Sequence, residues 1–231
     1  LQFSGTPEDY MIVNGVYQCR SCVPPVDVRT DGKDHKVAGH EMYYDTIAVR
    51  VLDDHSVEFT FKKEGKPVAR SKEIVSANGK TMLEVFQNVG GKEAVTGKAG
   101  FLRVGAASPG AHALSGKWQM RSIRNNTQAG TLTTYRSIPN GFSISDGAES
   151  FEAKFDGKDY PLGKDWLSTF SLKLIDENTL EETDKHQGEI LTVSRMTVSE
   201  DGKAMRVESM DRQRGTTMTY TAEKRSCEPG P

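Results

Sequence analysis

The sequence predicts an all-β protein made of two antiparallel meander units that follow each other along the chain. Three observations predict this fold: apolar and polar residues alternate over many short segments, turn-forming pairs separate these segments, and one half of the chain echoes the other. A chain of 231 residues is long enough for one large β domain or two small ones. Each unit would close into its own barrel, or the two would share one barrel or sandwich.

The segment 56–61 shows the alternation clearly, because Val57, Phe59 and Phe61 fall on one face of the expected strand and polar residues on the other. The other strand-like segments are 46–52, 168–174, 179–183, 190–198 and 204–210. Asp-Gly, Asn-Gly and Gly-Lys pairs recur between segments, since glycine and asparagine tolerate the positive φ of hairpin turns. Helical periodicity is hard to find, so the strands are expected to be joined by turns.

An internal repeat organises the chain. Residues 45–84 align without a gap on residues 168–207, at a constant offset. Identical pairs include Asp53/Asp176, Glu58/Glu181, Gly65/Gly188, Ser71/Ser194, Val75/Val198, Gly79/Gly202 and Met82/Met205. Because turn residues match turn residues, the expected organisation is a first repeat over 1–104, a linker of small residues over 105–114, and a second repeat over 115–231.

The charge balance and the hydropathy exclude two classes of protein. The chain has 30 Lys and Arg residues and 32 Asp and Glu residues, which gives a net charge of −2. A nucleic-acid-binding protein needs a surplus of basic residues. No apolar run approaches the roughly 18–20 residues that a membrane helix needs. We therefore expect neither a nucleic-acid partner nor a membrane span.

The three cysteines, Cys19, Cys22 and Cys227, leave at least one thiol outside any intramolecular pair. The close pair and the Thr- and Ser-rich strands favour a secreted or periplasmic protein, in which a Cys19–Cys22 disulfide would persist. Cys227 would then be able to link the chain covalently to a partner, and a homo-oligomer is the other assembly we consider.

Cys19, Cys22, His35 and His40 also have the C-x2-C-x12-H-x4-H spacing of a Cys2His2 zinc site. Such a site needs both histidines on one face of a helix, but the segment 31–39 contains two glycines and a turn signature. The second repeat has the same surrounding pattern without these ligands. No metal and no other cofactor is expected.

Residues 115–119 read Ser-Gly-Lys-Trp-Gln, a G-x-W at the start of the second repeat, and the strand pattern ends at 220–225. This start and finish resemble the lipocalin and lipocalin-like group, in which a Trp on the first strand packs under a basic residue from the last. The resemblance implies tandem lipocalin-like barrels, with Trp118 as a structural residue that closes one barrel end. Arg225, or Arg214 at the preceding turn, would supply the basic side chain.

The segment 17–25, Tyr-Gln-Cys-Arg-Ser-Cys-Val-Pro-Pro, is followed by an Asp-Gly-Lys turn and later by an Asp-Gly-Lys-Ala-Met turn. This combination resembles a group of uncharacterised, secreted bacterial β-rich proteins. The resemblance covers nearly the whole chain and implies export and a β-rich fold. It carries no known activity to transfer.

The sequence nominates no catalytic nucleophile, because it contains no G-x-S-x-G, H-E-x-x-H, P-loop or G-x-G-x-x-G motif. Glu182 and Asp184 share one strand face, as an acid/base pair would, but Phe59 and Phe61 stand at the matching positions of the first repeat. We interpret the two acids as part of an outer or interface face. Enzymatic activity is thus left undecided, and a non-enzymatic role is favoured.

The expected function is that of an exported binding protein whose lipocalin-like units take a small apolar or amphipathic ligand. Tyr43, Tyr44 and Trp166 lie just after matching turns of the two repeats and are the candidate ligand contacts. The alternative is an extracellular structural or interaction subunit that assembles through exposed strand edges.

Overall fold

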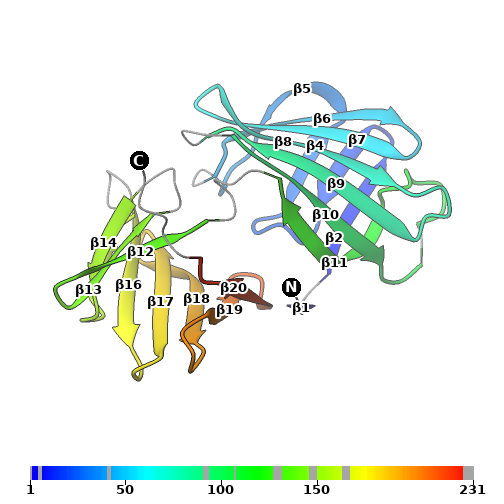
Figure 1. Cartoon of the computed structure of the whole chain (residues 1–231). Helices are drawn as coiled ribbons and strands as arrows, with labels where there is room; N and C mark the ends of the chain where they lie inside the picture. Colours follow the sequence, from blue (N-terminus) through cyan, green and yellow to red (C-terminus); the bar gives the residue numbers. More distant parts are fainter. Residues whose placement is uncertain are drawn as a thin grey trace, which may run out of the picture. The chain divides into compact units, whose positions relative to one another are not determined.

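A computed structural model describes residues 2–4, 7–40, 43–90, 94–106, 108–126, 132–145, 150–162 and 167–225. These residues form 20 strands in three antiparallel sheets and no helix (Figure 1). The predicted all-β fold class is confirmed. Since none of the described residues is helical, none of them forms a helix that could span a membrane.

The chain divides into two compact units. Among the described residues, 7–126 and Leu132 form the N-terminal unit, and 2–4, 133–145, 150–162 and 167–225 form the C-terminal unit. Each sheet lies wholly within one unit.

The N-terminal unit is a single ten-stranded sheet in the order β4-β3-β2-β11-β10-β9-β8-β7-β6-β5. Its strands are β2 (Glu8–Val13), β3 (Val16–Cys19), β4 (Val26–Arg29), β5 (Asp31–Lys36), β6 (Thr46–Asp53), β7 (Ser56–Lys63), β8 (Lys66–Val75), β9 (Thr81–Asn88), β10 (Val95–Arg103) and β11 (Gly116–Asn125). The two edge strands come together, because β4 contacts both β5 and β6. The sheet is therefore curled into a nearly closed barrel.

The C-terminal unit has a seven-stranded sheet in the order β1-β20-β19-β18-β17-β16-β15 and a three-stranded sheet in the order β12-β13-β14. Its strands are β1 (Gln2–Ser4), β12 (Thr134–Ile138), β13 (Gly141–Ser145), β14 (Ser150–Lys154), β15 (Tyr160–Pro161), β16 (Ser168–Leu174), β17 (Thr179–His186), β18 (Glu189–Val198), β19 (Ala204–Asp211) and β20 (Thr216–Glu223). The small sheet joins the large one where β14 contacts β15 and β16.

The two units place their strands at matching positions of the sequence. Strands β7, β8 and β9 begin at Ser56, Lys66 and Thr81, and β17, β18 and β19 begin at Thr179, Glu189 and Ala204, which preserves the offset of the alignment. The turn residues Asn14 and Asn140 both adopt positive φ, 51° and 57°, a conformation that asparagine tolerates better than most residues.

The boundary between the units differs from the predicted one. Strand β11 opens the second repeat in the sequence-based prediction, but it is hydrogen-bonded to β10 on one side and to β2 on the other. Because both of its edges are paired within the ten-stranded sheet, the predicted linker 105–114 lies inside the N-terminal unit. The division falls between Leu132 and Thr133 instead, and β1 at the start of the chain pairs with β20 in the C-terminal unit.

The two cores differ in size. Fifteen buried hydrophobic side chains form the described core of the N-terminal unit, with Val49 and Trp118 fully enclosed. Six form that of the C-terminal unit, in which Leu172 is fully enclosed. The larger core belongs to the unit whose sheet is continuous.

Candidate functional site

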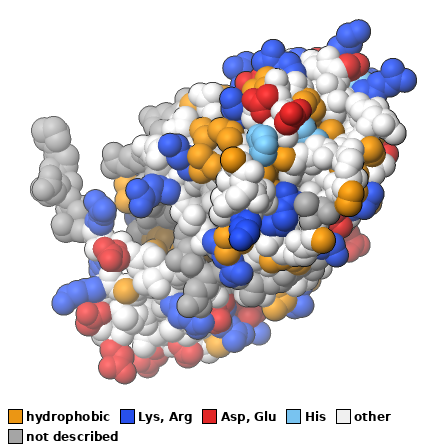
Figure 2. Space-filling view, turned by 90° about the vertical axis from the view of Figure 1, so that its right-hand side faces the viewer, with side chains coloured by type: hydrophobic (Ala, Val, Ile, Leu, Met, Phe, Trp, Pro, Cys, Tyr) orange, Lys and Arg blue, Asp and Glu red, His pale blue; other side chains and the backbone are white. Residues whose placement is uncertain are grey.

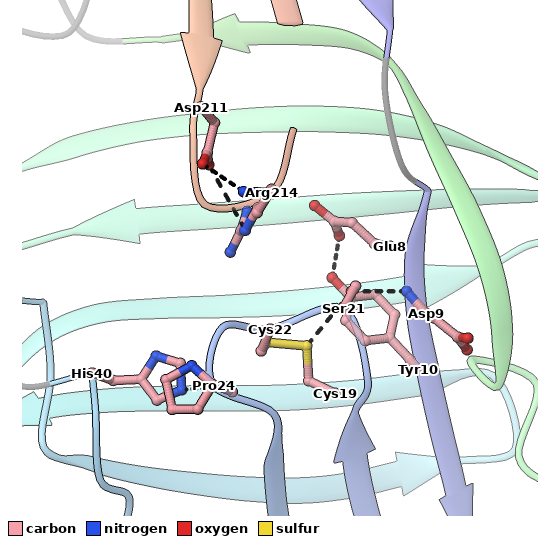
Figure 3. Close-up of a disulfide and its surroundings, with 10 residues drawn as sticks. All are labelled: Glu8, Asp9, Tyr10, Cys19, Ser21, Cys22, Pro24, His40, Asp211 and Arg214. Carbon is pink, nitrogen blue, oxygen red and sulfur yellow. Dashed lines mark hydrogen bonds and ion pairs between the residues drawn. A yellow bond between two sulfur atoms is a disulfide. The ribbon is translucent and has the colours of Figure 1, made fainter. Parts of the chain in front are cut away.

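Three glutamates lie inside the N-terminal unit. Glu73 on β8 is 9% exposed and alternates with Ile74, which is 37% exposed, so the carboxyl faces inward. Glu84 on β9 is the direct cross-strand neighbour of Glu73 and shares the inner face with buried Met82. Glu8 on β2 accepts a hydrogen bond from the hydroxyl of Tyr10 (Figure 3).

One carboxylate oxygen of this cluster is unsatisfied. The hydroxyl of Ser71 donates to Oε1 of Glu73 at 2.8 Å, but the buried Oε2 has no hydrogen-bond partner among the described residues. Leaving a buried polar group unpaired costs on the order of 1–3 kcal/mol. The site therefore contains a strong acceptor that a donor from outside the chain would satisfy.

Burial and mutual repulsion perturb the acids. Burial, followed by the nearby Glu84, raises the pKa of Glu73 well above its ordinary range. Burial, followed by Glu8, raises the pKa of Glu84 to about 7. Like charges placed directly opposite each other across two strands destabilise a sheet. A cation bound beside these acids would favour their charged forms and lower both pKa values.

A run of aromatic rings begins at Tyr10, whose hydroxyl donates to Glu8. Successive ring centroids lie 6.0 Å apart for Tyr10–Tyr17, 5.0 Å for Tyr17–Phe59, 6.3 Å for Phe59–Phe61, 4.9 Å for Phe61–Tyr44 and 5.1 Å for Tyr44–His40. Burial is the main cause that raises the pKa of Tyr10 and Tyr17, so both phenols stay protonated. The interior combines acidic oxygens with a large apolar surface.

The structure separates the predicted ligand contacts. Tyr44 stacks on His40 and packs edge-on against Phe61, within the aromatic run. Tyr43 is 60% exposed, and its ring is in none of these pairs, although the amides of Tyr43 and Tyr44 both donate to the carbonyl of His40 at 2.9 Å. Trp166 lies outside the described residues.

The glutamates escaped the sequence analysis because their strands have apolar residues on both faces. Leu83 and Val85 flank Glu84 and are 38% and 37% exposed, while Ile74 follows Glu73. A period of two shows that residues alternate, but it does not say which set faces inward. Glu73 is two residues from Ser71 and Val75, and Glu84 is two residues from Met82. This spacing is the only signal in the sequence that places the acids on the same strand face as those residues.

Apolar residues also reach the outside of the molecule. Figure 2 shows a face on which apolar, basic and acidic side chains are interspersed. A hollow of about 470 Å³ in the N-terminal unit is lined by Ile12, Val51, Asp54, His112 and neighbouring residues. It includes none of the three glutamates, and Nε2 of His112 is already bonded to the carbonyl of Asp53 at 2.7 Å.

Trp118 is fully buried, and the basic residue above it is Arg103, not Arg225 or Arg214. The guanidinium carbon of Arg103 lies 4.1 Å from the centroid of the indole, because the two residues are cross-strand neighbours on β10 and β11. Arg103 also donates to the carbonyls of Gly79, Ala113 and Ser115, and the indole Nε1 donates to the carbonyl of Leu114 at 2.7 Å. Arg225 is exposed at the end of the other unit.

Cys19 and Cys22 lie at disulfide distance, with their Cα atoms 5.4 Å apart (Figure 3). Their sulfurs bond each other, His40 Nε2 bonds the carbonyl of Pro24 at 2.8 Å, and His35 pairs with Asp31. The zinc-like spacing thus corresponds to three separate interactions. No group of metal-ligating side chains occurs among the described residues, and Cys227 lies beyond them.

The C-terminal unit buries acids at other positions. Burial, followed by Asp184, raises the pKa of Glu182 to about 7, and burial raises that of Asp184 to about 6. Glu182 is paired with buried Leu172, and Asp184 with buried Phe170, so both face the core. The interpretation of these acids as an outer face is wrong, because the inner position follows from the register of β16 and β17.

No family model, curated protein or solved structure matches the chain.

Proposed function

We propose that this chain is an exported, non-enzymatic binding protein whose N-terminal, lipocalin-like unit takes a small amphipathic ligand with a basic group. The observation that carries the proposal is the unpaired, buried Oε2 of Glu73 beside Glu84. An ammonium group would donate to this oxygen and offset the repulsion between the two carboxylates. The cost of burying the acids would then be recovered when the ligand binds.

The aromatic run supports an apolar body for this ligand. Small-molecule sites in proteins are lined mainly by apolar and aromatic side chains, with a few polar groups that orient the ligand. The ring centroids of Tyr17 and Phe59 lie 5.0 Å apart, and Tyr17 adjoins Tyr10, whose hydroxyl donates to Glu8. A cation beside a tyrosine ring gains a further cation–π attraction. We expect the basic group at Glu73 and the apolar part along Phe59, Phe61 and Tyr44.

The cysteine pair supports export. A disulfide in a protein of ordinary size persists in oxidising compartments and is rare in the cytosol. The matching strand starts of the two units support the further proposal that both descend from one duplicated meander. Protein isolated from its own source should contain the Cys19–Cys22 disulfide, and two free thiols at these positions would argue against export.

The ligand proposal is tested by titrating the full chain with dodecylamine, dodecanol and dodecanoate by calorimetry at pH 7. These three probes share the apolar chain and differ in the charge of the head group. We expect dodecylamine to bind most tightly and Glu73→Gln to weaken it about tenfold, which corresponds to about 1.4 kcal/mol. Affinity for dodecanol should stay unchanged in this variant.

Glu58→Gln is the matched control, because Glu58 lies on the outer face of the same unit and pairs with Arg50. It should leave all three affinities unchanged. Equal affinity for the amine and the carboxylate, or no binding of any probe, would exclude the proposed site.

A further inference from the structure

Strands β8–β11 of the N-terminal unit carry their acids and most of their bases on opposite sides of the sheet. Their only acids, Glu73 and Glu84, face inward. One base, Arg103, lies over Trp118. The other bases are exposed or partly exposed: Lys66, Arg70, Lys72, Lys98, Lys117, Arg121 and Arg124. The outer side of these four strands, the basic face, therefore concentrates positive charge in a chain whose net charge is −2.

The strand register places three of these bases in one row across the basic face. Successive cross-strand neighbours on β8, β9, β10 and β11 form this row: Lys72, Val85, Lys98 and Arg124. Within the part of the chain that the structure describes, none of the three bases forms an ion pair. The next position along the row, on β7, is Glu58, and this acid is bonded to Arg50. The row thus has positive charge to offer to a partner.

A second row, two residues away along each strand, is largely apolar. It consists of Ile74, Leu83, Gly100 and Ser122. Gly100 leaves space between its neighbours, because a Cβ at this position would lie 2.7 Å from Oγ of Ser122. Together with Leu102 and Arg121, these residues line a shallow hollow of about 500 Å³. Aliphatic surface therefore lies directly beside the row of bases.

The C-terminal unit balances its charges at the matching place. Arg195 on β18 aligns with Lys72, and it lies between Glu181 on β17 and Glu208 on β19. Arg195 is bonded to Glu181 at 3.2 Å, and Arg206 to Glu208 at 2.9 Å. The excess of bases is thus a property of the N-terminal unit, and the meander itself does not require it.

We propose that the basic face docks on the surface of a bilayer that contains anionic lipids. Its Lys and Arg side chains would pair with the phosphates of the head groups. Ile74, Leu83 and Leu102 would enter the boundary between head groups and acyl chains, which adds apolar burial to the electrostatic attraction. The aliphatic row favours a lipid surface over a single-stranded nucleic acid, since nucleic-acid bases stack on aromatic rings and the two rows contain none.

This inference does not depend on ligand binding at Glu73, whose side chain lies on the other side of the sheet. The first test uses the full chain and sedimentation with vesicles of phosphatidylglycerol and phosphatidylcholine in equal amounts. We expect these vesicles to bind at least about tenfold more tightly than vesicles of phosphatidylcholine alone. Added salt should weaken the binding, because it screens the charges. Equal affinity for the two kinds of vesicle, or no binding to either, would overturn the proposal.

A triple variant tests the row of bases. Replacing Lys72, Lys98 and Arg124 together by Gln should weaken binding to the anionic vesicles about hundredfold, which corresponds to about 3 kcal/mol. The matched control makes the same change of charge at three exposed bases of β4 and β5, with the substitutions R29Q, K33Q and K36Q. The control should bind nearly as tightly as the unmodified chain. An equal loss in both variants would attribute binding to net charge and contradict a docking face.

A change in the apolar row distinguishes a lipid surface from a soluble polyanion. Leu83→Ala should weaken vesicle binding about fivefold, because it removes aliphatic surface that enters the bilayer. Leu52→Ala is the matched control, since Leu52 is 37% exposed on β6, where Leu83 is 38% exposed on β9. Unchanged affinity in Leu83→Ala would assign the basic face to a soluble polyanion and overturn the proposal. The comparison of the two kinds of vesicle uses the unmodified chain, so it does not depend on any variant folding.

Discussion

Glu73 and Glu84 face each other across β8 and β9 on the inner surface of the N-terminal unit. A pair of like charges at such a position weakens a sheet unless one member stays protonated or a cation separates them. Burial is the main cause that raises the pKa of both acids, and Glu84 adds to the shift of Glu73 while Glu8 adds to that of Glu84. The stability of the N-terminal unit should therefore depend on pH through these two side chains.

The first prediction concerns stability as a function of pH. The folded state raises the pKa of Glu84 from 4.5 to about 7, so it binds the proton more tightly than the unfolded chain does. The resulting stabilisation is complete below pH 4.5 and is lost as the pH rises through about 7. The expected loss is on the order of 3–4 kcal/mol, since a tenfold change in proton affinity corresponds to about 1.4 kcal/mol.

Urea unfolding followed by Trp118 fluorescence, in a Trp166→Phe background, measures this loss. Glu84→Gln should reduce the slope of stability against pH between pH 5 and 8, whereas Glu58→Gln on the outer face should preserve it. The prediction is wrong if Glu84→Gln retains the full slope.

The second prediction concerns the residue above Trp118. Arg103→Met should destabilise the N-terminal unit by about 2–4 kcal/mol, because it leaves the carbonyls of Gly79, Ala113 and Ser115 without their donor and removes the cation–π contact. Arg225→Met should change the free energy of unfolding by less than about 0.5 kcal/mol, since Arg225 is exposed. Equal effects in thermal unfolding would contradict this assignment.

The third prediction concerns the cysteine pair. Replacing Cys19 and Cys22 together by Ala should destabilise the N-terminal unit by about 2 kcal/mol, because the disulfide closes a short loop in the unfolded chain. Dithiothreitol should lower the stability of the unmodified chain to that of the variant and leave the variant unchanged. A reductant effect of equal size on both proteins would place the sensitive bond elsewhere.

The fourth prediction separates the neighbouring tyrosines. Tyr44→Ala should cost about 1–3 kcal/mol and weaken dodecylamine binding, because the ring packs between His40 and Phe61. Tyr43→Ala should leave both properties within error, since its side chain is 60% exposed. Denaturant titration and calorimetry on the two variants provide the comparison, and a larger effect at Tyr43 would reverse the assignment.

Much of the fold could be predicted from local pattern. Alternation located the strand at 56–61, which became part of β7 (Ser56–Lys63), and the Asn14-Gly15 pair predicted a turn that the positive φ of both residues explains. The close spacing of Cys19 and Cys22 predicted their pairing. Each of these features depends on a few adjacent residues, so neighbouring side chains and backbone preferences were sufficient.

The candidate site was harder to predict, because it depends on which face of each strand is inside. Ile74 and Glu73 are adjacent, and only the curvature of the sheet decides that the acid is buried while the isoleucine is half-exposed. Of the three predicted ligand contacts, the structure places Tyr44 in the aromatic run and Tyr43 on the surface. The acids themselves come from β2, β8 and β9, which are far apart in sequence.

Local sequence patterns were sufficient to predict an all-β chain, most of its strands and turns, and the pairing of Cys19 with Cys22, because alternation and turn propensity act between near neighbours. The place of β11 in the N-terminal unit and the packing of Arg103 over Trp118 depend on the folded structure. It also decided that Glu73 lies opposite Glu84 in the interior. These relationships arise from strand order and register, which are set by contacts between distant segments that no local pattern records.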